Sequence, residues 1–182
     1  NPGLASDTGE GPRVIDKIDI LPPTDPIVQV SGGAYHSIVL TKAGQVLTWG
    51  AGQLGQLGRP PVSDADDASG LPVDAIPRPV KGIPQSDKVT RIGSGFYNTF
   101  AICQSGALYC EGENQNQQCG AGRRRHEEDF RNLRYMTPVR EVASFQVAEA
   151  AGGYCHTLIR TVVGKVYSMG CGEEGQRGVG AP

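Results

Sequence analysis

Residues 50–55, Gly-Ala-Gly-Gln-Leu-Gly, have the G-x-G-x-x-G spacing that lets backbone amides approach a dinucleotide pyrophosphate. The same spacing returns at residues 170–175. A dinucleotide site also needs a helix directly after the glycines and an acidic residue about 20 positions further on. Pro60 and Pro61 follow the first copy instead, with a polar loop behind them. We therefore interpret both copies as structural turns and expect no cofactor.

His36 and His156 are candidates for general bases or metal ligands. Both follow a glycine-rich turn, and Asn98 occupies the aligned position between them. An asparagine amide can take over a hydrogen-bonding role, but it can hardly replace a catalytic base. We therefore interpret the two histidines as structural residues that bond backbone groups between repeats.

The five cysteines do not have the spacing of a familiar zinc site. Their odd number, the absence of a C-x-x-C pair and their positions in expected strands predict free, partly buried thiols in a reducing compartment. The cysteines are Cys103, Cys110, Cys119, Cys155 and Cys171. The sequence also has no nucleophile elbow, no H-E-x-x-H and no P-loop. We expect no catalytic residues, no metal site and no enzyme activity.

Two charged segments are candidates for binding a partner. Arg123, Arg124 and Arg125 form the one basic cluster, which could contact phosphates or an acidic partner. Acidic residues follow at 127–129, so a solvated loop of mixed charge is the simpler interpretation. The second candidate is an acidic segment, and its carboxylates belong to Asp64, Asp66 and Asp67.

All of these residues lie in or between three copies of one pattern, at 30–58, 92–120 and 150–178. Recurrence at such a period indicates a repeat architecture, in which each unit buries its faces against its neighbours. We expect the aligned positions to be structural. They are Gly33, His36, Gly44, Trp49, Gly50 and Gly58 in the first copy, Gly106 and Gly112 in the second, and Gly153, His156, Gly164 and Gly170 in the third.

Within each copy the pattern predicts a β-hairpin. In the first copy, residues 37–41 are short and rich in β-branched side chains, residues 42–44 form a turn, and residues 46–49 run back. A fourth strand is expected near 77–83 and near 137–142. A further strand is expected before each hairpin, at 26–30, 88–92 and 146–150. Three or four short antiparallel strands per unit are typical of a propeller blade.

Two insertions separate the copies. Residues 60–85 are rich in proline and acidic side chains and are expected to form a surface loop. Residues 121–145 contain Phe130, Leu133 and Arg134 on one helical face, which predicts a short helix. Binding specificity is usually found in such insertions on a rigid scaffold.

The repeat resembles that of the regulator of chromosome condensation family, most fully in the first copy, where Gly33, His36, Gly44, Trp49 and Gly50 all match. This resemblance implies an all-β fold of propeller blades, about three of a seven-bladed ring. We therefore expect a part of a larger propeller. The expected divisions are an extended arm at 1–26, a blade with an acidic loop at 27–88, a blade with a basic loop at 89–146 and an incomplete blade at 147–182.

The net charge of −2 gives no reason to expect nucleic-acid binding through this segment. The sequence has no apolar run near the roughly 20 residues that span a membrane. We expect a non-enzymatic protein-interaction scaffold, a subunit of a larger assembly. The alternative implied by the resemblance is guanine-nucleotide exchange on a Ran-like small GTPase, with chromatin association. The expected location is intracellular, cytoplasmic or nuclear, with the mitochondrion also open.

Overall fold

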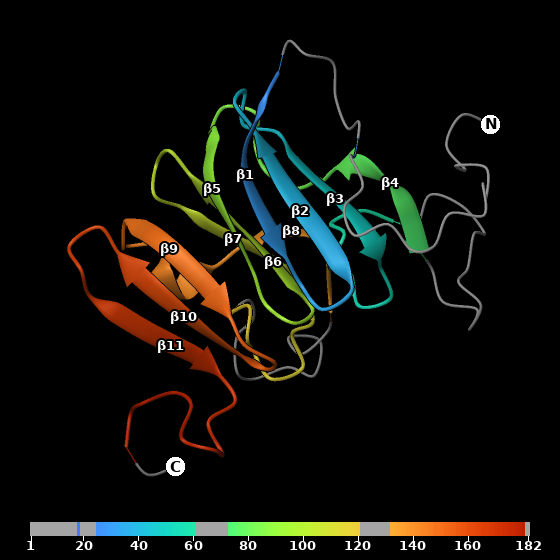
Figure 1. The fold of residues 1–182 in the computed structure, drawn as a ribbon. Coiled ribbons are helices and arrows are strands. Elements are labelled where there is room, and N and C mark those ends of the chain that lie inside the picture. Colours follow the sequence, from blue (N-terminus) through green and yellow to red (C-terminus); the bar gives the residue numbers. More distant parts are fainter. Residues whose placement is uncertain (1–17, 19–24, 61–72, 121–131, 181–182) are drawn as a thin grey trace.

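The computed structural model describes residue 18 and residues 25–60, 73–120 and 132–180 (Figure 1). This part of the chain forms three antiparallel sheets, which we call blades 1 to 3. Blade 1 consists of β1 (Ile27–Gly32), β2 (His36–Thr41), β3 (Val46–Ala51) and β4 (Val73–Pro79). Blade 2 consists of β5 (Val89–Ser94), β6 (Asn98–Cys103), β7 (Leu108–Gly112) and β8 (Leu133–Pro138). Blade 3 consists of β9 (Val147–Gly152), β10 (His156–Thr161) and β11 (Val166–Gly170).

The expected all-β fold of propeller blades is confirmed. In every blade the strands pair in chain order, and the predicted hairpins are β2–β3, β6–β7 and β10–β11. The register repeats as well, since His36 pairs with Gly50, Asn98 with Gly112 and His156 with Gly170. The strands expected before the hairpins are β1, β5 and β9.

The fourth strands begin earlier than expected. β4 lies inside the segment 60–85, which was expected to be a surface loop, and β8 ends at Pro138 instead of starting there. Both are outer strands that carry prolines, Pro77 and Pro79 in β4 and Pro138 in β8. An edge strand tolerates proline because one side of its backbone has no partner strand, so a rule that treats proline as a strand breaker fails there.

The short helix expected within 121–145 is wrong for its described residues. Leu133 and Arg134 belong to strand β8, and the segment contains only a single 3-10 turn, Arg140–Val142, among the residues that the structure describes. Pairing with β7 fixes this stretch, since Gly112 lies opposite Leu133. Tertiary pairing thus overrides a weak helical pattern. Phe130 lies outside the described residues.

The hydrophobic core lies between the blades. One cluster, which includes Ile38, Leu40 and Ala101, fills the interface of blades 1 and 2. A second cluster, which includes Phe100 and Ile159, fills the interface of blades 2 and 3. A single blade therefore has no core of its own, and each sheet depends on its neighbour for burial.

Candidate interaction surface

His36 connects blade 1 to blade 2. Its Nε2 lies 3.0 Å from Thr99 Oγ1, and the Thr99 hydroxyl donates to the backbone oxygen of Gln56 at 2.9 Å. Because the Thr99 hydroxyl donates its proton to the backbone oxygen of Gln56, its own oxygen accepts a hydrogen bond from the N–H at His36 Nε2. Burial lowers the pKa of His36 to about 4, and a backbone hydrogen bond with Asn98 raises this pKa by a smaller amount. The ring is therefore neutral at pH 7.

Asn98 and His156 do not repeat this bridge. Asn98 donates within its own blade, to the backbone oxygens of Glu113 at 2.7 Å and Glu111 at 3.3 Å. His156 is half-buried and packs against Gly153. The hydroxyl bond of the next residue does recur. Thr157 donates to the backbone oxygen of Gln118 at 2.6 Å, as Thr99 does to that of Gln56. Adjacent blades are thus joined by a threonine–carbonyl bond.

The glycine motifs form turns. In blade 1 the chain leaves β3 at Ala51 and turns twice, and the Gln56 side chain accepts from the Leu54 amide at 2.9 Å. Gln118 and Gln176 do the same for the amides of Asn116 and Glu174. No helix follows the glycines of residues 50–55 or 170–175 in the described part of the chain, so the element that a pyrophosphate site requires is missing there.

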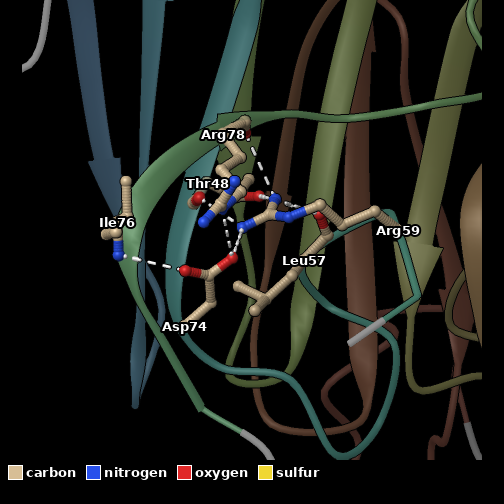
Figure 2. Close-up of polar contacts among 6 residues, drawn as sticks. All are labelled: Thr48, Leu57, Arg59, Asp74, Ile76 and Arg78. Atoms are coloured by element: carbon tan, nitrogen blue, oxygen red, sulfur yellow. Dashed lines mark hydrogen bonds and ion pairs between the residues drawn. The ribbon is translucent and has the colours of Figure 1, made fainter. Parts of the chain in front are cut away.

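A buried ion pair holds the base of the acidic insertion (Figure 2). The Arg59 guanidinium donates to Asp74 at 2.9 Å, and these two residues flank the segment 61–72. Arg59 also donates to both oxygens of Thr48, at 2.6 and 2.9 Å, and to Leu57 O at 2.9 Å. Arg78 approaches the same Asp74 oxygen at 3.2 Å. The two ends of the segment 61–72 are therefore held together beside β3.

Each blade ties its third strand to the following turn at one equivalent pair of positions. In blade 1 the Thr48 hydroxyl donates to Leu57 O at 2.8 Å, and in blade 3 the Ser168 hydroxyl donates to Arg177 O at 2.8 Å. In blade 2 the equivalent residues are Cys110 and Cys119, which form a disulfide with Cα atoms 5.5 Å apart. This covalent tie closes the turn directly before the insertion 121–131 that carries the arginines.

The expectation of free thiols is therefore wrong for four of the five cysteines. Cys155 and Cys171 form a second disulfide, with Cα atoms 5.7 Å apart. The Cys110–Cys119 pair arises because the turn after β7 folds back on its own hairpin, and sequence spacing does not show that reversal. Cys155 and Cys171 instead lie opposite each other at the end of the β10–β11 hairpin, next to the pair of His156 and Gly170. Cys103 is free and buried, and burial followed by its contacts with Asp87 raises the pKa of its thiol to about 12. That thiol is protonated and unreactive at neutral pH.

The equivalence of these tying positions predicts a stability difference between two cysteine-free versions of blade 2. C110T/C119A has a hydroxyl at the position that Thr48 occupies in blade 1, whereas C110V/C119A has the same shape there and no group to bond the turn. Because both variants lack the disulfide and carry alanine at position 119, these contributions cancel. We expect C110T/C119A to be more stable by about 1 kcal/mol, the value of one buried hydrogen bond. Urea unfolding under reducing conditions measures this, and equal midpoints for the two variants would refute the equivalence.

The predicted partner-binding residues Asp64, Asp66, Asp67, Arg123, Arg124 and Arg125 lie outside the described residues. The structure describes the ends of the two insertions instead. In blade 1 both ends lie at the Arg59–Asp74 pair. In blade 2 the Cys110–Cys119 disulfide lies directly before the insertion, and the chain after it enters β8 at Leu133, opposite Gly112.

Sequence reasoning missed one buried ionisable group, Glu111. It occupies the position of Trp49 in the repeat, and its side chain is fully buried against Gly58. Burial raises the pKa of the Glu111 carboxyl well above its usual value, and the nearby Arg59 guanidinium opposes this shift. Neither carboxyl oxygen has a hydrogen-bond partner in the described structure. The signal in the sequence was the acidic residue at an otherwise apolar repeat position.

Among the described residues, no three His, Cys, Asp or Glu side chains gather closely enough to hold a metal ion. Within the same ranges no helix has the length and apolar character needed to cross a bilayer.

Comparison with known proteins points to one family. Residues 27–56 and 43–102 match two models of the regulator of chromosome condensation (RCC1) repeat. The protein pim1 of Schizosaccharomyces pombe is 33% identical over 153 residues, which cover 84% of this chain and 26% of pim1. The human regulator of chromosome condensation is 30% identical over 152 residues, covering 84% of this chain and 32% of the relative.

Among solved structures, Prp20p from Saccharomyces cerevisiae, a protein described with its binding properties to Gsp1p and histones, superposes with a TM-score of 0.70. It is 22% identical, and the match covers 86% of this chain and 36% of Prp20p. The chain therefore spans about a quarter to a third of the length of these relatives.

Proposed function

Because this chain belongs to the regulator of chromosome condensation repeat family, we propose that it is a non-enzymatic propeller module that binds protein partners through its loops. In this proposal it is a subunit of a larger assembly in the cytoplasm or nucleus. Its parts are the arm 1–26, the blades 27–88 and 89–146, and the incomplete blade 147–182.

The observation that carries this proposal is the fixed base of each insertion. Arg59 donates hydrogen bonds to Asp74 and to the backbone around β3. The Cys110–Cys119 disulfide closes the turn before the second insertion. A loop whose ends are held this firmly loses less conformational entropy on binding than one on a mobile stem. In this proposal the partners bind the two segments of opposite charge in the sequence, which contain Asp64, Asp66 and Asp67 in one and Arg123, Arg124 and Arg125 in the other.

The non-enzymatic part of the proposal rests on how the ionisable groups are used. His36, the histidine bonded to a hydroxyl, is buried and bridges two blades. Glu111 is sealed against Gly58 without access to solvent, and the Cys103 thiol is protonated at neutral pH. His36 and Glu111 are enclosed by packed residues, and Cys103, although it lines a small pocket beside Gln104, has a protonated thiol that is a poor nucleophile.

The test is affinity purification of the full chain from its own cells with mass spectrometry. Two matched variants neutralise one surface each: D64N/D66N/D67N and R123Q/R124Q/R125Q. We expect the wild-type chain to recover a fixed set of proteins and at least one variant to lose a member of it. Recovery of the same proteins by all three versions would refute binding through the insertions.

The alternative function is guanine-nucleotide exchange on a Ran-like small GTPase, with chromatin as a second partner. It is supported by the yeast relative, which is described with its binding to Gsp1p and histones. The two functions separate in one assay, the release of a fluorescent GDP analogue from a Ran-like GTPase. The scaffold proposal predicts the same release rate with and without the chain. Acceleration that saturates with chain concentration would establish exchange activity instead.

A further inference from the structure

The β1–β2, β5–β6 and β9–β10 turns lie at the same end of the three blades (Figure 1). Four aromatic side chains on these turns contact one another. We call them the aromatic cluster: Tyr35, Phe96, Tyr97 and Tyr154. Phe96 lies at its centre, with ring centroids 4.7 Å from Tyr97, 4.8 Å from Tyr154 and 6.2 Å from Tyr35. Tyr97 also stacks with Tyr35 at 6.2 Å. These spacings are typical of interacting rings.

Backbone hydrogen bonds between the blades hold the cluster together. The Ala34 amide donates to Phe96 O at 3.0 Å, and the Phe96 amide donates to Gly153 O at 3.0 Å. Each bond joins the turn of one blade to the turn of the next. Two of the four rings are nevertheless open to solvent, since Tyr35 and Tyr154 are each 62% exposed, and Phe96 and Tyr97 are half-buried between them. A rigid, exposed aromatic patch is typical of a binding surface.

A carboxylate lies beside these rings. Tyr97 and Glu113 occupy the positions that Cys155 and Cys171 occupy in blade 3, where the residues are close enough for a disulfide. The Glu113 amide also donates to Tyr97 O at 3.1 Å. Glu113 Oε2 accepts no hydrogen bond from the described residues. Burial raises the pKa of the Glu113 carboxyl. Desolvation also raises the pKa of Tyr97, and the nearby Tyr35, Tyr154 and Glu113 raise it further, in that order.

We propose that the aromatic cluster and Glu113 bind an arginine side chain of a partner protein. A guanidinium stacks on aromatic faces, whose quadrupole attracts a cation, and it pairs with a carboxylate through its planar N–H groups. A purely apolar partner would cover the partly desolvated Glu113 without neutralising it, which costs binding energy. This inference adds a binding surface of stated chemistry to the interaction function proposed above and rests on that function.

The first test needs no variant. A fluorescent Gly-Ser peptide with several arginines is compared with the same peptide in which citrulline replaces each arginine, since citrulline keeps the shape and removes the charge. Anisotropy titration of the full chain measures both. We expect the arginine peptide to bind about tenfold more tightly, in the range of desolvated cation–π contacts. Equal binding of the two peptides, or none, would overturn the proposal in favour of an apolar partner or a second copy.

Variants then place the binding. We expect Tyr35→Leu and Glu113→Gln each to weaken the arginine peptide about fivefold, because each removes one part of the recognition. The matched control is Tyr135→Leu, since Tyr135 is 46% exposed on β8 and outside the cluster. Loss of binding by the control to the same extent would show that the peptide binds elsewhere, which also overturns the proposal.

Failure of this inference is separable from failure of the proposed function. If Tyr35→Leu and Glu113→Gln recover the wild-type set of proteins from cells and the arginine peptide does not bind, the interaction function stands and the arginine site is wrong. If the arginine peptide binds with the expected selectivity but the wild-type chain recovers no protein, the site stands and the interaction function is wrong.

Discussion

Gly112→Ala is expected to destabilise the chain by about 4 kcal/mol, the sum of backbone strain and a steric clash. Gly112 has φ 104°, a conformation that L-residues avoid. Its added Cβ would also overlap the backbone oxygen of Tyr97 and come 3.0 Å from the Cα of Asn98. Neither atom can withdraw, because Asn98 pairs with Gly112 and Tyr97 O accepts from the Glu113 amide at 3.1 Å.

Two other glycines separate strain from clash. Gly164 has φ 81° but no atom within 4 Å of an added Cβ, so Gly164→Ala is expected to cost about 1–2 kcal/mol from strain alone. Gly32 has neither problem, and Gly32→Ala is expected to change stability by less than about 0.5 kcal/mol. Urea unfolding of all three variants measures the series. A loss at Gly112 no larger than the loss at Gly164 would show that the predicted clash is absent.

Glu111→Gln is expected to make the chain progressively more stable than the wild type as the pH rises. The folded state raises the pKa of Glu111 above its ordinary 4.5, so at low pH both states hold the proton and the residue has no effect on the pH dependence. Above pH 4.5 the unfolded chain releases the proton while the folded chain retains it. The wild-type free energy of unfolding then falls by about 1.4 kcal/mol for each pH unit up to the folded pKa.

Glutamine has nearly the same shape and no charge, so the variant does not show this fall. Denaturant unfolding of both chains at several values between pH 4 and pH 8 measures the difference, which we expect to widen above pH 4.5 until the pH reaches the folded pKa of Glu111. His36, whose pKa is lowered to about 4, contributes to both curves alike. The matched control is Glu149→Gln, because Glu149 forms an exposed ion pair with Arg160 and its side chain is 63% exposed. Parallel curves for the wild type and Glu111→Gln would contradict a raised pKa.

The hairpins could be predicted from the sequence because local signals and repetition agree there. Turn glycines such as Gly44 and β-branched runs such as residues 37–41 recur in register, so each copy supports the others. The outer strands could not be placed, because β4 and β8 owe their existence to pairing with β3 and β7 and carry prolines that argue locally against a strand. Long-range pairing is invisible to local propensity.

The candidate surfaces also combine features that the sequence predicts with features that depend on long-range pairing. The two charged insertions are visible as composition, whereas Arg59 and Asp74 meet only because β4 folds back beside β3. The Cys110–Cys119 pair depends on a reversal of the chain after the β6–β7 hairpin. The aromatic cluster had a sequence signal, an aromatic residue directly before the position of His36 in two copies. Tyr154 stands one position earlier in the third copy, which obscured it.

Strand β6 has no solvent-facing side, since all six of its residues are buried. Phe100 and Ile102 belong to the core shared with blade 3, whereas Ala101 and Cys103 belong to the core shared with blade 1. Neighbouring residues of β6 therefore pack in two different interfaces, and the stabilities of the two end blades are coupled through this strand. A cavity at Phe100 and one at Ala101 would weaken opposite ends of the molecule, although the two residues share a peptide bond.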